Sequence, residues 1–158
     1  MRYVRSKILR VYVDTSVFGG VFDAEFSIAS SKLFHRIRQG RFQLIVSGLV
    51  QKEIANAPQQ VQDLFYDIIQ LAEIVDVDEN MLRLMHGYID AKIVTDKWRD
   101  DALHVAQATV AGCNLIVSWN FKHIVHYEKI PLYNAVNVLH GYNNIAIHSP
   151  LEVISDEK

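Results

Sequence analysis

The 158-residue chain is 50% hydrophobic, with 16 basic and 18 acidic side chains and a formal net charge of −2. This composition excludes a disordered chain and an overall positive field, so a polyanionic partner would need a local basic patch. The single cysteine, Cys113, excludes an internal disulfide and favours a reducing location. The apolar run near the N-terminus is short and interrupted by Arg10 and Asp14, so we expect a cytoplasmic protein without a membrane segment. The length predicts one domain over residues 1–158, with a core of about 8–148 and a disordered tail at 155–158.

Strands and helices are predicted to alternate along the chain, from the spacing of apolar residues and from N-cap residues such as Ser47 and Asp78. In chain order, we expect a strand at 8–14, a short helical turn or loop at 17–22, a helix at 27–39, a strand at 42–46, helices at 48–56 and 58–71, a strand at 73–77, helices at 79–91 and 95–111, a strand at 114–118, a turn into a short helix at 119–123, a helix at 131–140, a strand at 145–147 and a turn at 150–154. The alternation predicts a three-layer α/β/α sandwich with a central, mostly parallel sheet of about five strands.

Four polar residues lie at the ends of predicted strands or near the starts of predicted helices. Asp14 ends the first strand, and Glu53 lies in the helix after the second. Asp101 lies in the first turns of its helix, and Asn120 follows the strand at 114–118. Because the carboxyl ends of parallel strands share one edge of the sheet, these side chains could approach one another.

Three acids gathered at one edge would favour a bound cation. At about 5 Å and an effective dielectric of about 20, two carboxylates repel by roughly 3 kcal/mol. Protonation or a bridging cation would relieve this repulsion, and oxygen ligands without sulfur suit Mg²⁺ or Mn²⁺. Such an ion could orient a phosphodiester, stabilise its charge and activate water.

Each of these residues also has a simpler interpretation. Asp14 could be a helix N-cap, and Glu53 an exposed helix acid. Asp100 and Asp101 could favour the helix dipole, and Asn120 could form an Asx turn. The shared placement of the four positions therefore supports a site more strongly than any single residue does.

Four short segments resemble motifs of the PIN domain, the fold of VapC-like toxin ribonucleases of type II toxin–antitoxin systems. They are residues 11–16 (VYVDTS), 47–53 (SGLVQKE), 101–106 (DALHVA) and 115–121 (LIVSWNF), which occur in the family's order. The resemblance implies a PIN-like α/β/α sandwich and Mg²⁺- or Mn²⁺-dependent RNA cleavage. It also implies that Asp14, Glu53 and Asp101 are the catalytic and metal-binding acids.

Asn120 departs from the family pattern, because many members carry a fourth acid at this position. An amide oxygen can still ligate a metal or accept a hydrogen bond, but the negative charge is lost. We therefore expect a one-metal site in which Asn120 serves as a further catalytic-site residue. The departure also favours an alternative function, that of a catalytically weak or inactive PIN-like module that binds protein or RNA.

Other side chains near the predicted site could contact substrate or support the acids. Asp100 competes with Asp101 as the ligand, although adjacent helical residues point about 100° apart. His104, one turn after Asp101, is expected to hydrogen-bond within the helix or the core. The remaining candidates for substrate or supporting contacts are Thr15, Ser16, Ser118 and Lys122. Basic and aromatic side chains that could contact RNA, or could form an ordinary solvated surface with buried aromatics, are Lys52, Lys97, Arg99, Trp119, Phe121 and Lys122.

The sequence thus predicts a metal-dependent endoribonuclease, the toxin of a toxin–antitoxin pair. The expected partners are an RNA substrate, a small antitoxin protein and a second copy of the chain. A phosphohydrolase with Asp14 as nucleophile is the third possibility. It is disfavoured because the Asp-x-Asp pair of aspartyl-phosphate enzymes is absent, with Ser16 at the second position.

Overall fold

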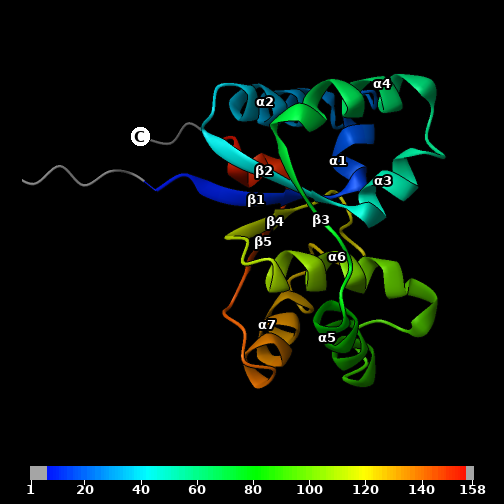
Figure 1. The fold of residues 1–158 in the computed structure, drawn as a ribbon, viewed down its shortest axis with the longest axis vertical. Coiled ribbons are helices and arrows are strands. Elements are labelled where there is room, and N and C mark those ends of the chain that lie inside the picture. The colour runs from blue at the N-terminus through cyan, green and yellow to red at the C-terminus, as the bar shows by residue number, and fades with distance from the viewer. Residues whose placement is uncertain (1–6, 156–158) are drawn as a thin grey trace, which may run out of the picture.

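The computed structural model describes residues 7–155, and a five-stranded sheet forms its framework (Figure 1). All neighbouring strands pair in parallel, in the spatial order β3-β2-β1-β4-β5. The strands are β1 (Leu9–Val13), β2 (Phe42–Ser47), β3 (Ala72–Val75), β4 (Leu115–Val117) and β5 (Ala146–His148). The predicted parallel sheet of about five strands is confirmed.

Helices cover both faces of the sheet and make the molecule a three-layer α/β/α sandwich, as predicted (Figure 1). The first layer holds α1 (Thr15–Gly20), α2 (Ser27–Arg38), α3 (Gly48–Ile54) and α4 (Gln59–Ile68), with α8 (Pro150–Val153) packed against α2. The second holds α5 (Glu79–Asp90), α6 (Arg99–Val110) and α7 (Ile130–Leu139). Two short 3₁₀ helices are η1 (Ile69–Leu71), after α4, and η2 (Asp96–Trp98), before α6.

The central strand β1 fixes where a site can form. Its residues Val11, Tyr12 and Val13 are fully buried, as expected for a parallel strand covered on both faces. From β1 the chain moves outward to β2 and β3, and then crosses back to β4 on the other side of β1. The direction of winding therefore reverses between β1 and β4. The carboxyl ends of strands at such a switch point are where open α/β sheets bind ligands.

The predicted helix caps form where the sequence places them. The Ser47 hydroxyl accepts a hydrogen bond from the Val50 backbone N–H (3.2 Å), and the Asp78 carboxylate accepts one from the Met81 N–H (2.8 Å). The short helix expected after residue 119 does not form, and turns take its place. The Asn120 Oδ1 atom accepts a hydrogen bond from the backbone N–H of His123 (2.9 Å), three residues on, and the Asn120 carbonyl accepts one from the Ile124 N–H (3.1 Å). Asn120 therefore caps a single turn that does not continue into a helix.

The C-terminal tail and the membrane-spanning potential of the helices complete the comparison with the sequence. Of the tail predicted to be disordered, residues 156–158 lie outside the described residues. Within the described part of the chain, no helix combines the length and apolar character needed to cross a membrane.

Gly20 lies where a larger residue does not fit. A Cβ atom there would lie 2.6 Å from Ser30 Oγ and 2.7 Å from Trp119 Nε1, which are hydrogen-bonded to each other (2.8 Å). We expect Gly20→Ala to lower the free energy of unfolding by about 1–3 kcal/mol, because two buried groups must move. Gly19→Ala is the matched control, since nothing lies within 4 Å of its Cβ position. Urea unfolding measures both, and a Gly20→Ala protein as stable as wild type would refute the close packing.

Candidate active site

Asp14 lies at the switch point, directly after β1. Its backbone N–H donates to the Val117 carbonyl (3.3 Å), and its side chain is only 4% exposed. The Ser16 hydroxyl donates to Oδ1 and the Ser118 hydroxyl donates to Oδ2, both at 2.6 Å. Although Asp14 occupies the N-cap position of α1, its side chain makes no capping hydrogen bond. The two serines therefore fix the carboxylate in the orientation that it holds at the sheet edge.

Glu53 reaches the same edge from α3. Its Oε1 atom accepts hydrogen bonds from Thr15 Oγ1 (2.9 Å) and from His104 Nε2 (2.6 Å). The other ring nitrogen of His104, Nδ1, is hydrogen-bonded to the Tyr12 hydroxyl (2.7 Å), which also contacts Ser47 Oγ (2.8 Å). A continuous chain of hydrogen bonds thus runs from the core side of β1 through α6 to the Glu53 carboxylate.

His104 is a buried base placed among acids. Burial lowers the pKa of its imidazole, but the hydrogen bond that it donates to Glu53 and the negative charges of Asp14, Glu53 and Asp101 outweigh burial, so the pKa is raised. Burial raises the pKa of Glu53, yet the contacts with His104 and Thr15 leave it below its ordinary value. The pair is therefore an imidazolium and a carboxylate at mildly acidic pH.

This ion pair should make stability depend on pH in a defined window. The folded pKa of His104 lies above its ordinary 6.5, so its contribution is complete below that pH and is lost as pH rises through the folded pKa. The folded pKa of Glu53 lies below its ordinary 4.5, so its contribution is complete above that pH and is lost as pH falls through the folded pKa.

The loss of unfolding free energy in His104→Gln, relative to wild type, should therefore be largest between pH 4.5 and 6.5. It should shrink as pH rises further, because the imidazole of the wild type then loses its charge. Urea unfolding of both proteins at about pH 5.5 and about pH 8.5 measures this difference. An equal difference at both pH values would contradict the assignment of a charged pair.

Asp101 comes to the edge from the first turn of α6 and is half-buried. Burial raises its pKa and the charge of Glu53 raises it further, whereas a hydrogen bond with Asn120 and the nearby His123 and His104 lower it. The Asn120 amide therefore has two contacts, since its Oδ1 atom accepts the His123 N–H and its side chain also bonds Asp101.

The structure brings most of the predicted site residues together. Residues linked by hydrogen bonds or by charge at this edge are Asp14, Thr15, Ser16, Glu53, Asp101, Ser118 and Asn120. Asp100 is exposed at the neighbouring position of α6, and the exposed Lys122 lies beside Trp98 instead of among the acids. The expected hydrogen bond of His104 within the core is confirmed by its contact with Tyr12. Sequence reasoning missed its pairing with Glu53, although its position three residues after Asp101 was a signal, because such residues share one helix face.

The donor atoms at this edge fit a hard divalent cation in kind, because carboxylate oxygens are the ligands that Mg²⁺ and Mn²⁺ prefer. The burial that raises the pKa of Asp14, to which the charge of Glu53 adds, is also consistent with a place for positive charge. Among residues 7–155, however, no group of three or more His, Cys, Asp or Glu side chains is arranged to hold a metal ion. Glu53 is paired with His104 instead.

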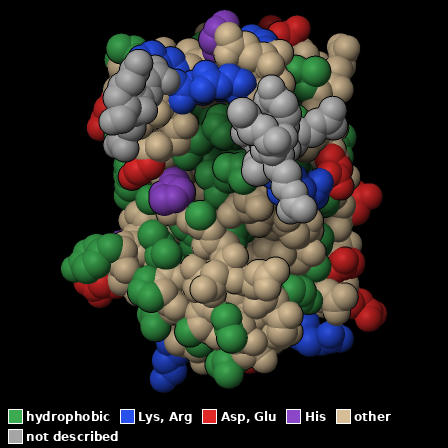
Figure 2. Space-filling model, turned by 90° about the vertical axis from the view of Figure 1, so that its left-hand side faces the viewer, with side chains coloured by type: hydrophobic (Ala, Val, Ile, Leu, Met, Phe, Trp, Pro, Cys, Tyr) green, Lys and Arg blue, Asp and Glu red, His purple; other side chains and the backbone are tan. Residues whose placement is uncertain are grey.

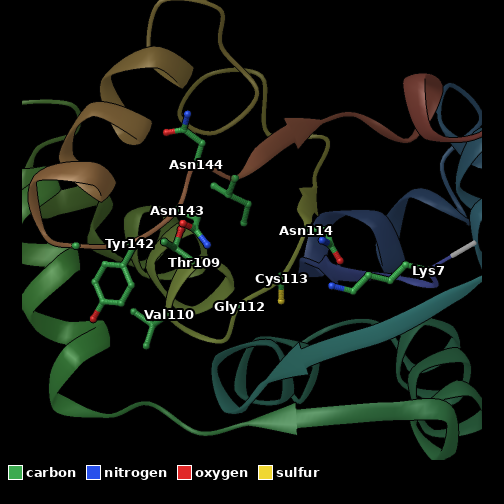
Figure 3. A pocket seen from close by; sticks show the side chains of 11 residues that line it. Lys7, Thr109, Val110, Gly112, Cys113, Asn114, Tyr142, Asn143 and Asn144 are labelled. Carbon is green, nitrogen blue, oxygen red and sulfur yellow. The ribbon is translucent and has the colours of Figure 1, made fainter.

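Two cavities differ in their relation to the acids. A hollow of about 400 Å³ borders the site and is lined by Ser16, Gly19, Gly20, Asp23, Phe26, Trp119 and Asn120. A second cavity of about 410 Å³ is lined at the amino ends of the strands, among others by Lys7, Cys113, Asn114 and Asn143 (Figure 3). Figure 2 views the molecule from this amino-end side, where hydrophobic side chains are spread over the surface. The second cavity therefore lies at the edge of the sheet opposite the acids.

The fold and the site thus define an α/β protein with an acidic edge at the switch point of a parallel sheet. No protein-family model and no curated protein sequence matches the chain. Solved structures that contain chains of similar fold include one VapBC structure and two of FitA and FitB. VapBC2 from Rickettsia felis, bound to a DNA fragment from its promoter, shares 14% identity over 89% of this chain and 98% of that chain, with a TM-score of 0.58.

The other two structures are of FitA–FitB complexes. FitAcB from Neisseria gonorrhoeae shares 11% identity over 89% of this chain and 98% of that chain, with a TM-score of 0.57. FitAB bound to an IR36 DNA fragment shares 11% identity over 94% and 98% of the two chains, with a TM-score of 0.56. At such identities the likeness concerns the fold. It confirms the PIN-like fold that the resemblance implied.

Proposed function

We propose that the chain is a metal-dependent endoribonuclease that hydrolyses RNA phosphodiester bonds. The observation that carries this proposal is the convergence of Asp14, Glu53 and Asp101, from three separate elements, at the switch point of the sheet. Their charges act on one another, since Glu53 raises the pKa of both Asp14 and Asp101. The hollow of about 400 Å³ beside Asn120 and Ser16 leaves room for part of a nucleotide.

Mg²⁺ or Mn²⁺ would be held by Asp14, Glu53 and Asp101, with Asn120 completing the shell or orienting water. A single divalent ion is expected, because the fourth position is an amide without charge. When bound, the ion supplies positive charge that orients the phosphodiester and stabilises the negative charge that develops on it.

The residues around the acids have a positioning role in this proposal. Ser16 and Ser118 hold both oxygens of Asp14, and Thr15 and His104 hold one oxygen of Glu53. Because these partners fix the direction of each carboxylate before substrate binds, little reorganisation is needed during the reaction. His104 also supplies positive charge among the acids.

The similar folds support a place in a toxin–antitoxin pair. VapBC2 and FitAB are toxin–antitoxin complexes, and both were solved with DNA. On this basis, the chain would act in the cytoplasm as the toxin, bind a small antitoxin protein and form a homodimer. Exposed apolar side chains such as Phe22 (42% exposed) and Leu71 (49%) are available for such contacts.

A second candidate function is a PIN-like binding module without catalysis. Two observations favour it. The described residues contain no preformed three-ligand group for a metal, and the carbonyl oxygen of Asn120 is engaged by the His123 N–H.

Calorimetric titration with Mn²⁺ separates the two functions. The nuclease predicts binding of one ion by wild type, loss of this binding in Asp101→Asn, and retention in Asp100→Asn, which removes the same charge from an exposed position. A folded wild-type protein that binds no Mn²⁺ would support the binding module instead.

A further inference from the structure

Two lysines from distant parts of the chain meet at one indole ring. The Nζ atom of Lys97 lies 5.0 Å from the centroid of the Trp98 ring, and the Nζ atom of Lys122 lies 5.2 Å from it. Lys97 and Trp98 belong to η2, whereas Lys122 lies in the turns after β4. Cation–π attraction to the same ring therefore gathers two positive charges at one place.

Among residues 7–155, no ion pair joins either ammonium group to an acid. Both lysine side chains are exposed. Since both ammonium groups lie near the same ring, they are within about 10 Å of each other, which is about one Debye length at 0.1 M salt. Lys97, Trp98 and Lys122 thus form a small basic patch in a chain whose net charge is −2, with Asp96 and Asp100 adjacent to it in the sequence.

A buried histidine joins this patch to the acids. The His123 ring lies 4.6 Å from the Trp98 ring at 32° and is 8% exposed, yet neither ring nitrogen has a hydrogen-bond partner among the described residues. Buried polar atoms without partners are uncommon in native proteins and call for an explanation such as a ligand. The backbone of His123 binds Asn120, which in turn binds Asp101, so the patch lies next to the acidic site.

We propose that Lys97, Trp98 and Lys122, with His123 beside them, form the surface that binds the phosphate backbone of the RNA strand next to the acids. This inference rests on the proposed ribonuclease function and specifies where its substrate lies. A polyanionic strand needs nearby positive charge to approach three carboxylates, and this patch supplies it. Because ammonium groups contact phosphates and read no bases, the surface positions RNA of any sequence.

The test measures RNA binding separately from cleavage. Fluorescence anisotropy follows a labelled single-stranded RNA bound to the full chain in EDTA, over a series of salt concentrations. Each lysine that neutralises one phosphate adds about 0.7 to the slope of log affinity against log salt, which is about fivefold in affinity at 0.1 M. The double variant Lys97→Gln/Lys122→Gln should therefore bind about 25-fold more weakly, with a slope lower by about 1.4. Lys7→Gln removes one lysine charge at the opposite edge of the sheet and should bind like wild type, whereas Lys97→Gln or Lys122→Gln alone should bind about fivefold more weakly.

The outcomes distinguish this surface from the proposed function. Lysine-dependent RNA binding by a protein that cleaves nothing would support the surface and overturn the ribonuclease. Cleavage by wild type, with unchanged binding and slope in the double variant, would overturn the surface alone. Wild type that binds no RNA, or that binds an acidic peptide through these lysines instead, would overturn the surface as well.

Discussion

Asp101→Asn should slow metal-dependent RNA cleavage by about 1,000-fold, the upper range for losing one group that acts on transition-state charge. The substitution keeps the shape of the side chain but removes one of three negative charges at the site edge. Asp101 is half-buried, is hydrogen-bonded to Asn120 and lies close enough to Glu53 for that charge to raise its pKa. We therefore expect no other side chain to take over the role of the Asp101 carboxylate. Single-turnover cleavage of a labelled RNA with Mn²⁺ measures the rate.

Asp100→Asn is the matched control for this prediction. It removes the same charge one position earlier in α6, where the side chain is exposed. We expect its cleavage rate to remain within about twofold of wild type, because adjacent helical residues point about 100° apart. Equal losses in the two variants would show that net charge, and not the position of Asp101, governs the reaction.

His104→Gln should slow cleavage by about 10- to 100-fold, the usual cost of losing a partner that orients a metal ligand. Glutamine carries no positive charge and lacks the second ring nitrogen that links Tyr12 to Glu53. The same change should lower the free energy of unfolding by about 1–3 kcal/mol, because buried polar groups lose a partner. Cleavage rates and urea unfolding on the same preparations measure both effects.

A double-mutant cycle separates a positioning role of His104 from a general loss of structure. If His104 acts through Glu53, then adding His104→Gln to Glu53→Gln should cause little further loss of cleavage. The rates are compared at a temperature where all variants are folded. A further loss as large as that of the single His104 variant would contradict the positioning role.

The fold and the edge on which the acids lie could be predicted from the sequence, because both follow from local patterns. Short apolar runs alternating with helical spacing indicate a parallel sheet, and such a sheet places the ends of its strands at one edge. Asp14 follows the central strand directly, so its place was determined once β1 was recognised. The caps Ser47 and Asp78 were predictable for the same reason, since an N-cap depends on residues within one turn.

The contacts that organise the site were not predictable in the same way. Tyr12 and His104 are separated by 92 positions, and their hydrogen bond depends on how α6 packs on β1. The pairing of Glu53 with His104 likewise joins two helices on opposite faces of the sheet. The prediction of a short helix after Trp119 was wrong: Asn120 caps one turn, as a helix N-cap would, but the chain makes no second turn of helix there.

RNA cleavage by the acidic edge with a divalent ion can be tested in a single cleavage assay. Wild type and Asp14→Asn are incubated with a pool of structured and single-stranded RNA in Mg²⁺, in Mn²⁺ and in EDTA. We expect cleavage by wild type in at least one metal, none in EDTA and none by Asp14→Asn. Cleavage that persists undiminished in Asp14→Asn, or in EDTA, would contradict this expectation.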